Sequence, residues 1–211
     1  MKKMILSIAI VAAGLAFFYI FFIDGTYRTP VQAIEKARNL DEPIEIVQEQ
    51  KKGDGEVVFY LRYIHQRNPS PVISVDYTSR ALMGWRWVTG GGHTLMESDE
   101  AMAEQERLDA QWSAQWVPGE DETPFPLLFG AVVNPDIASV TVTDVKTATT
   151  ETAEMIVAGN DLRIWYLFVD ESQGTDFTLH ALSAEGDVLS TQQLNGKPLH
   201  AGTMTREEIL K

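Results

Sequence analysis

The chain contains no cysteine, and this absence limits how its fold can be stabilised. Among its 211 residues none can form a disulfide, carry a thioether-linked lipid or act as a thiol nucleophile. If the protein is exported, burial of apolar side chains alone must hold the fold together. Exported domains without cysteine are more typical of a single-membrane, Gram-positive-like cell envelope.

Positive charge is also scarce. The chain has 17 Lys and Arg against 30 Asp and Glu, a formal net charge of −13. Lys2 and Lys3 are the only charged residues before position 24, so the remainder carries −15. This charge opposes binding to nucleic acid and to anionic lipid headgroups, because both are polyanions. We therefore expect no nucleic-acid partner, and a soluble, acidic surface.

Motifs for catalysis and metal binding are missing. No serine lies in a Gly-x-Ser-x-Gly sequence, and the four histidines include no i,i+4 pair. These histidines are His65, His93, His180 and His200. Surface or half-buried positions are the ordinary interpretation of scattered histidines. The sequence therefore predicts no catalytic, cofactor-binding or metal-binding residue.

Two polar segments allow a ligand-binding alternative. The run Gly90-Gly91-Gly92 could bring backbone amides close to a phosphate, but it has neither dinucleotide-fingerprint nor P-loop spacing, which favours a flexible exit from a strand. Residues 170–176 resemble a calcium loop, but the glycine is one place early and no closing glutamate follows. A hairpin turn is the favoured interpretation.

An uncharged apolar run from 4 to 23 dominates the start of the chain. Twenty residues at 1.5 Å per residue span about 30 Å, the thickness of a bilayer's hydrocarbon core. The preceding lysines place the N-terminus in the cytoplasm and the rest outside. A cleaved signal peptide is the alternative. The bulky residues 17–23, without a small-residue cleavage site, favour an uncleaved anchor, with residues 1–23 as cytoplasmic start and transmembrane helix.

The spacing of apolar residues predicts an α+β module over residues 24–94. Thr29 and Pro30 begin a helix of about three turns. Strands are expected near 44–48, 56–65, 72–77 and 84–88, because the apolar period changes to two. Residues 95–123 form an acidic helical connector. In it Leu108, Trp112 and Trp116 share one helix face, and the segment 118–124 is the best boundary between modules.

The third part, residues 124–211, contains only strand signals. Short β-rich segments alternate with turn residues. They lie at 127–133, 137–142, 153–158, 163–169, 177–182 and 188–193. The expected fold class is thus α+β: a transmembrane helix, a small module of one helix and an antiparallel sheet, and an all-β, sandwich-like module.

Four tryptophans are candidate partner-facing residues. Trp85 and Trp87 are two apart and point the same way on a strand, while Trp112 and Trp116 would lie on the connector helix. Packing in the core is one interpretation, and an aromatic surface patch that faces a protein or a glycan is the other.

Several segments resemble a known group of proteins. They are 27–34, 84–92, 128–137, 163–165 and 184–189, and together they span most of residues 27–193. The chain thereby resembles uncharacterised single-pass, externally exposed membrane proteins of Bacillus-like Gram-positive bacteria. That group has no assigned activity, so the resemblance implies a location and no chemistry.

These features favour a membrane-anchored, extracytoplasmic interaction or sensing module without catalytic activity. The expected partners are the membrane, through residues 4–23, and a protein or cell-wall component, and no cofactor is expected. The alternative is a cell-wall-associated hydrolase with an unrecognised active site. A buried cleft that holds a histidine or carboxylate pair with perturbed protonation would favour the hydrolase.

Overall fold

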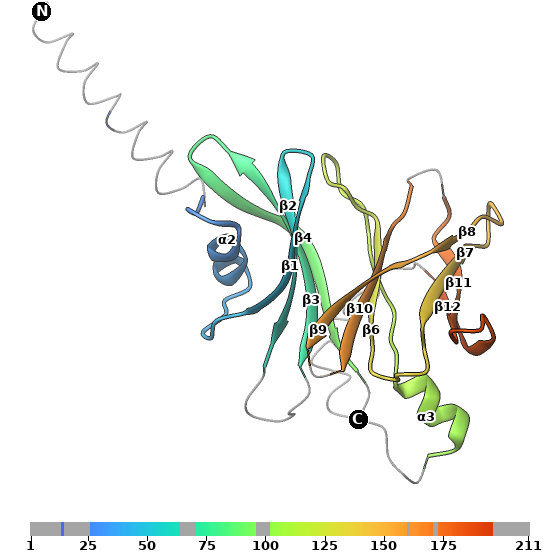
Figure 1. Cartoon of the computed structure of the whole chain (residues 1–211). Coiled ribbons are helices and arrows are strands. Elements are labelled where there is room, and N and C mark those ends of the chain that lie inside the picture. The colour runs from blue at the N-terminus through green and yellow to red at the C-terminus, as the bar shows by residue number, and fades with distance from the viewer. Residues whose placement is uncertain are drawn as a thin grey trace, which may run out of the picture. The chain divides into compact units, whose positions relative to one another are not determined.

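The computed structural model describes residue 14 and residues 26–63, 71–95, 102–159, 161–170 and 173–195. Within them the chain forms three four-stranded antiparallel sheets and only two short helices (Figure 1). The expected α+β class is therefore wrong, and the fold is mostly β. The chain divides into two compact units, Met1–Arg62 with Val75–Gly90, and Tyr63–Ser74 with Gly91–Lys211. Strands β3 and β4 contribute residues to both.

The first sheet is a meander, as its alternating apolar residues predict. Its strands follow one another in the order β1-β2-β3-β4. They are β1 (Glu45–Lys52), β2 (Gly55–Arg62), β3 (Val72–Ala81) and β4 (Gly84–Thr94). Four neighbouring strands with one covered face are enough for independent stability, which a lone hairpin lacks.

Helix α2 (Pro30–Ala37) packs on this sheet. Thr29 caps it as expected, because its hydroxyl oxygen accepts a hydrogen bond from the Gln32 N–H at 3.2 Å. Ile34 is fully buried and forms a small core with Val58 and Tyr60 of β2. The helix ends earlier than the sequence suggested, after two turns rather than three.

The glycines at 90–92 lie inside β4 and do not end the strand. A β-carbon on Gly90 would lie 1.9 Å from Asp76 Oδ1, and one on Gly92 would lie 2.6 Å from Ser74 Oγ. Glycine is therefore needed here for close packing against β3, and the expected flexible exit is absent.

The remaining strands form two sheets of the second unit. One has the order β5-β6-β10-β9 and the other β12-β11-β7-β8. The strands are β5 (Gln115–Val117), β6 (Leu127–Val132), β7 (Ser139–Asp144), β8 (Thr150–Thr152), β9 (Glu154–Gly159), β10 (Leu162–Phe168), β11 (Asp176–Leu182) and β12 (Val188–Asn195). Six of them lie within a few residues of the predicted segments.

Both of these sheets contribute to one hydrophobic core. Leu128 and Trp165 from the first sheet pack in the same cluster as Val140, Phe177 and Leu179 from the second. Residues on the two inner faces thus bury each other. This arrangement is compatible with the expected sandwich.

The helical connector is the largest local error of the sequence interpretation. Helix α3 covers only Glu104–Ala110. Trp112 follows in an isolated bridge to Val132, and Trp116 lies in β5. Backbone pairing with β6 outweighs the helical conformation that the four-residue apolar spacing of this segment indicates. The expected boundary at 118–124 connects β5 and β6, which are neighbours in one sheet.

Two further expectations concern loops and the anchor. Residues 170–176 join β10 to β11, which belong to different sheets, so this segment is a crossover and not a hairpin turn. No helix within the described ranges is long and apolar enough to cross a membrane. The expected transmembrane helix is thus not part of the described fold, and residues 4–23, apart from Gly14, lie outside it.

Candidate functional site

The four candidate tryptophans belong to different units. Trp85 and Trp87 lie in β4 of the first, half-buried, and Trp112 and Trp116 lie in the second. Trp112 is only 2% exposed, and its indole N–H donates to Ser190 Oγ at 2.9 Å. Trp116 is half-buried against Phe177, with ring centroids 5.3 Å apart. At Trp112 the core interpretation therefore fits.

In the first unit, Asp76 is the centre of a buried polar cluster. Its side chain is fully buried, and its carboxylate accepts hydrogen bonds from three residues. Arg38 donates through Nε and Nη2 at 2.6–3.0 Å. Tyr60 donates its hydroxyl at 2.5 Å, and Trp87 donates Nε1 at 2.8 Å. The Arg38 guanidinium also lies 5.8 Å from the Trp87 ring centroid.

This cluster of Asp76, Arg38, Tyr60 and Trp87 has a structural role. Burial raises the pKa of the Asp76 carboxyl, while the Arg38 guanidinium and the two neutral donors oppose that rise. Every carboxylate oxygen has donors, so little capacity is left for a ligand. Since Arg38 follows α2 and Asp76 lies in β3, the pair fixes the helix on the sheet.

In the second unit, His93 forms a chain of hydrogen bonds with two residues. Its Nδ1 lies 2.9 Å from Gln115 Oε1, and its Nε2 lies 2.7 Å from Ser113 Oγ. An amide oxygen can only accept, so Nδ1 carries the proton and Nε2 accepts from the Ser113 hydroxyl. Ser113 Oγ also accepts the Ala131 N–H at 3.0 Å.

The surroundings keep this imidazole neutral. Burial lowers the pKa of His93, and the Gln115 hydrogen bond only partly opposes this. The Phe129 ring lies 5.2 Å away by centroids. A neutral histidine bonded to a hydroxyl is chemically a base next to a nucleophile. Ser113 and Gln115 carry no local sequence signal, because their contacts with His93 span about twenty residues.

Close packing holds Ser113 in place. Its carbonyl accepts the indole N–H of Trp165 at 2.9 Å, and its N–H donates to the Ala131 carbonyl. A β-carbon on Gly130 would lie 1.8 Å from the Ser113 carbonyl oxygen. Glycine at 130 therefore permits this segment to lie against β6.

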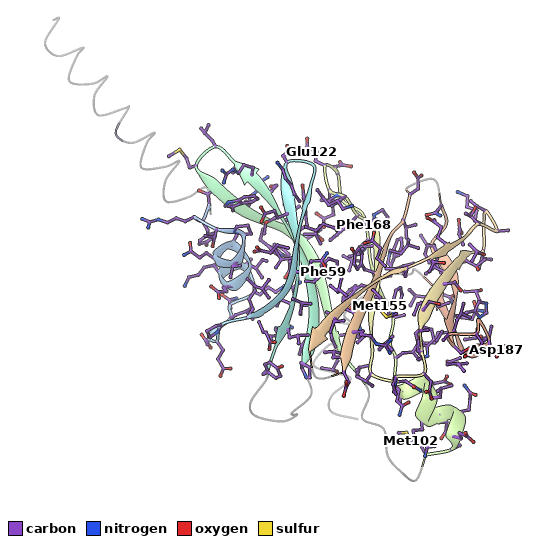
Figure 2. All side chains as sticks on the ribbon, in the orientation of Figure 1. Phe59, Met102, Glu122, Met155, Phe168 and Asp187 are labelled. Carbon is purple, nitrogen blue, oxygen red and sulfur yellow. The ribbon has the colours of Figure 1, made fainter. Side chains whose placement is uncertain are left out.

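A hollow lies beside α3 in the second unit. It has a volume of about 430 Å³. Met102, Glu106, Asp109, Ala110 and Gln192 line it. Met102, labelled in Figure 2, precedes α3, and Gln192 lies in β12. The lining combines apolar atoms with two carboxylates, which suits an apolar side chain that carries a positive charge.

The wall of this hollow is fixed to the core. Asp109 accepts a hydrogen bond from Ser190 Oγ, which in turn accepts from Trp112 Nε1. Gln192 Nε2 donates to the Trp112 carbonyl at 3.4 Å. Trp112, for which the sequence left both a core and a surface position open, therefore supports the hollow from the core side.

Of the remaining histidines, the structure describes only His180. His180 Nδ1 lies 2.9 Å from Thr191 Oγ1, and His65 and His200 lie outside the described residues. Over the described parts of the chain, no group of three or more histidine, aspartate or glutamate side chains could hold a metal ion. No protein-family profile, curated protein or solved structure matches the chain.

Proposed function

We propose that the protein is a single-pass, membrane-anchored module that binds a partner outside the cytoplasm without catalysing a reaction. The apolar run at 4–23, with two lysines before it, supports the anchor and the orientation. The anchor rests on sequence alone. The resemblance to externally exposed membrane proteins of Bacillus-like bacteria is consistent with this location.

The hollow beside α3 is the observation that carries the binding function. Met102 and Ala110 offer apolar surface, while Glu106 and Asp109 offer negative charge. A lysine or arginine side chain has an apolar stem and a cationic end, which this lining complements. The partner that fits best is therefore a basic protein segment or an amine-bearing wall component.

Charge reversal in α3 tests this proposal. Glu106 lines the hollow, whereas Glu104 is also exposed on α3 but does not line it. Affinity purification of the full chain from solubilised membranes should recover one reproducible partner with wild type and Glu104→Lys. With Glu106→Lys the amount of recovered partner should fall about tenfold or more. That fall corresponds to a loss of at least ~1.4 kcal/mol of binding free energy. Equal recovery with both variants would contradict the proposed site.

A wall-associated hydrolase is the second candidate, and the His93–Ser113 contact is the observation that favours it. A neutral base 2.7 Å from a hydroxyl has the geometry of an activated serine. Against it, Gln115 supplies no negative charge to stabilise an imidazolium. A fluorophosphonate probe decides between the candidates: labelling of Ser113 that is lost in His93→Gln favours the hydrolase, and an unlabelled chain favours binding alone.

A further inference from the structure

One end of the first unit's sheet combines apolar tips with basic side chains. At the turn between β3 and β4, Leu82 is 88% exposed and Met83 is 41% exposed. Leucine exposed to this degree at the tip of a hairpin contributes nothing to the core. Two adjacent exposed apolar side chains with charged residues around them are a candidate contact surface, and the chain connectivity at this hairpin decides what it could contact.

The chain that follows the apolar run is bound to this same hairpin. Tyr27 exchanges two backbone hydrogen bonds with Trp85, at 2.7 and 2.8 Å. A β-carbon on Gly84 would lie 2.3 Å from the Tyr27 carbonyl oxygen, so the contact is tight. Figure 1 shows the start of α2 beside the β3–β4 hairpin.

Chain length then limits where the hairpin can lie. Tyr27 is four residues after Ile23, the last residue of the apolar run, and four extended residues span at most about 14 Å. If the run occupies the hydrocarbon core, Tyr27 and Trp85 lie at the depth of the headgroups, where aromatic residues concentrate in membrane proteins. Leu82 and Met83 then lie beside the bilayer.

The local charge at this end differs from that of the chain. Arg28, Arg80 and Arg86 are exposed near the hairpin, and the Arg80 guanidinium lies 4.8 Å from the Trp85 ring centroid. The β1–β2 turn lies at the same end, since the Arg80 N–H donates to the Asp54 carbonyl. That turn adds the basic residues Lys51 and Lys52 and the acidic residues Asp54 and Glu56.

We propose that this end of the sheet docks on the outer surface of the bilayer that holds the anchor. Its contact residues are Arg28, Arg80, Leu82, Met83 and Arg86. Leu82 and Met83 enter the interface between headgroups and acyl chains. The arginines bind anionic lipid phosphates, which guanidinium groups match well. This docking rests on the proposed anchor, and it fixes the orientation of the first unit on the membrane.

The absence of cysteine provides a clean test on the full chain. Leu82→Cys and a matched control, Val157→Cys, which is 76% exposed on β9, are each labelled with a nitroxide. The proteins are reconstituted in vesicles of phosphatidylglycerol and phosphatidylcholine. The rate at which the nitroxide collides with a water-soluble nickel complex should fall by about tenfold at position 82, because a side chain inserted below the headgroups is shielded from water, and it should stay unchanged at 157.

Charge variants and an extraction step separate the possible failures. Arg86→Glu should restore nickel access at position 82, whereas Arg107→Glu on α3 should not, and vesicles of phosphatidylcholine alone should weaken the protection. Alkaline carbonate extraction reports the anchor independently. A chain that stays in the vesicles while position 82 remains as accessible as 157 overturns the docking alone. A chain that is extracted overturns the anchor, and the docking with it.

Discussion

The Arg38 guanidinium lies 2.6 Å from the Asp76 carboxylate, and this ion pair joins the end of α2 to β3. The carboxylate is fully buried and the arginine side chain is 20% exposed. Breaking a buried pair by removing one partner typically costs about 3–5 kcal/mol, because the other charge is left without compensation. Removing either side chain alone should therefore destabilise the protein strongly.

A double-mutant cycle measures this coupling. Arg38→Met and Asp76→Asn should each destabilise the protein by about 3–5 kcal/mol, and the double variant should cost about 1–3 kcal/mol less than the sum. Denaturant unfolding of the four proteins gives the values. Additive costs would show that the two side chains stabilise the fold independently.

Trp165 should be a position of the second unit that is highly sensitive to truncation. It is fully buried in the shared core and donates its indole N–H to the Ser113 carbonyl. Trp165→Ala should cost about 3–5 kcal/mol, since it leaves a cavity and an unpaired carbonyl. His180→Ala, at a half-buried position on β11, is the control and should lie within about 0.5 kcal/mol of wild type. Similar denaturant midpoints for both variants would contradict the assigned core.

His93 should make stability depend on pH near neutrality. Because burial lowers its pKa in the folded state, the unfolded chain binds a proton more readily, with an ordinary pKa of about 6.5. The free energy of unfolding should therefore fall as pH decreases below about 7. His93→Gln removes this dependence, so its slope between about pH 7 and pH 5 should be smaller. Parallel curves for the two proteins would show that His93 does not contribute.

Asp144 should stabilise the loop that it organises. Burial acts to raise its pKa, but hydrogen bonds from the Gly174 N–H, the Thr147 hydroxyl and the Lys146 N–H outweigh this and lower it. Its contribution is present above the unfolded pKa of about 3.9 and is lost as pH falls through the lower folded value.

Replacement by asparagine isolates this effect. Asp144→Asn places an amide where donors converge and should cost about 1–3 kcal/mol at pH 7. Asp187→Asn, at the exposed β11–β12 turn labelled in Figure 2, should be near neutral. The gap between the two variants should narrow as pH falls below the unfolded pKa of about 3.9, and it should close below the lower pKa that Asp144 has in the folded protein. A gap that persists there would mean that the amide itself disturbs packing.

Local patterns predicted the strands well, because they depend on neighbouring residues. The period-two spacing placed β2, β6 and β11 to within a few residues, and Thr29-Pro30 marked the start of α2. The run Gly90–Gly92 led to a wrong prediction of a strand end. Glycine ordinarily indicates a break in a strand, but here the close approach of residues such as Asp76 leaves no space for a side chain. The segment that contains Trp112 and Trp116 misled because pairing with β6, a tertiary effect, overrode its helical spacing.

The candidate sites lay beyond local patterns altogether. His93 meets Ser113 and Gln115 across about twenty residues, and Asp109 meets Ser190 across 81. Such contacts depend on which strands are neighbours, which alternation of apolar residues does not specify. The tryptophans illustrate the same limit, because Trp112 is buried in the core whereas Trp116 is half-buried at its edge.

The topology of the full chain tests the central claim most directly. A reporter that is active only outside the cytoplasm, fused after Lys211, should be active, and the fusion should remain in the membrane fraction after carbonate extraction. An inactive reporter would place the C-terminal part in the cytoplasm. A mature protein in the medium whose N-terminus lies between Ile23 and Thr29 would show that the apolar run is a cleaved signal peptide. Either result contradicts a membrane-anchored, extracytoplasmic binding module.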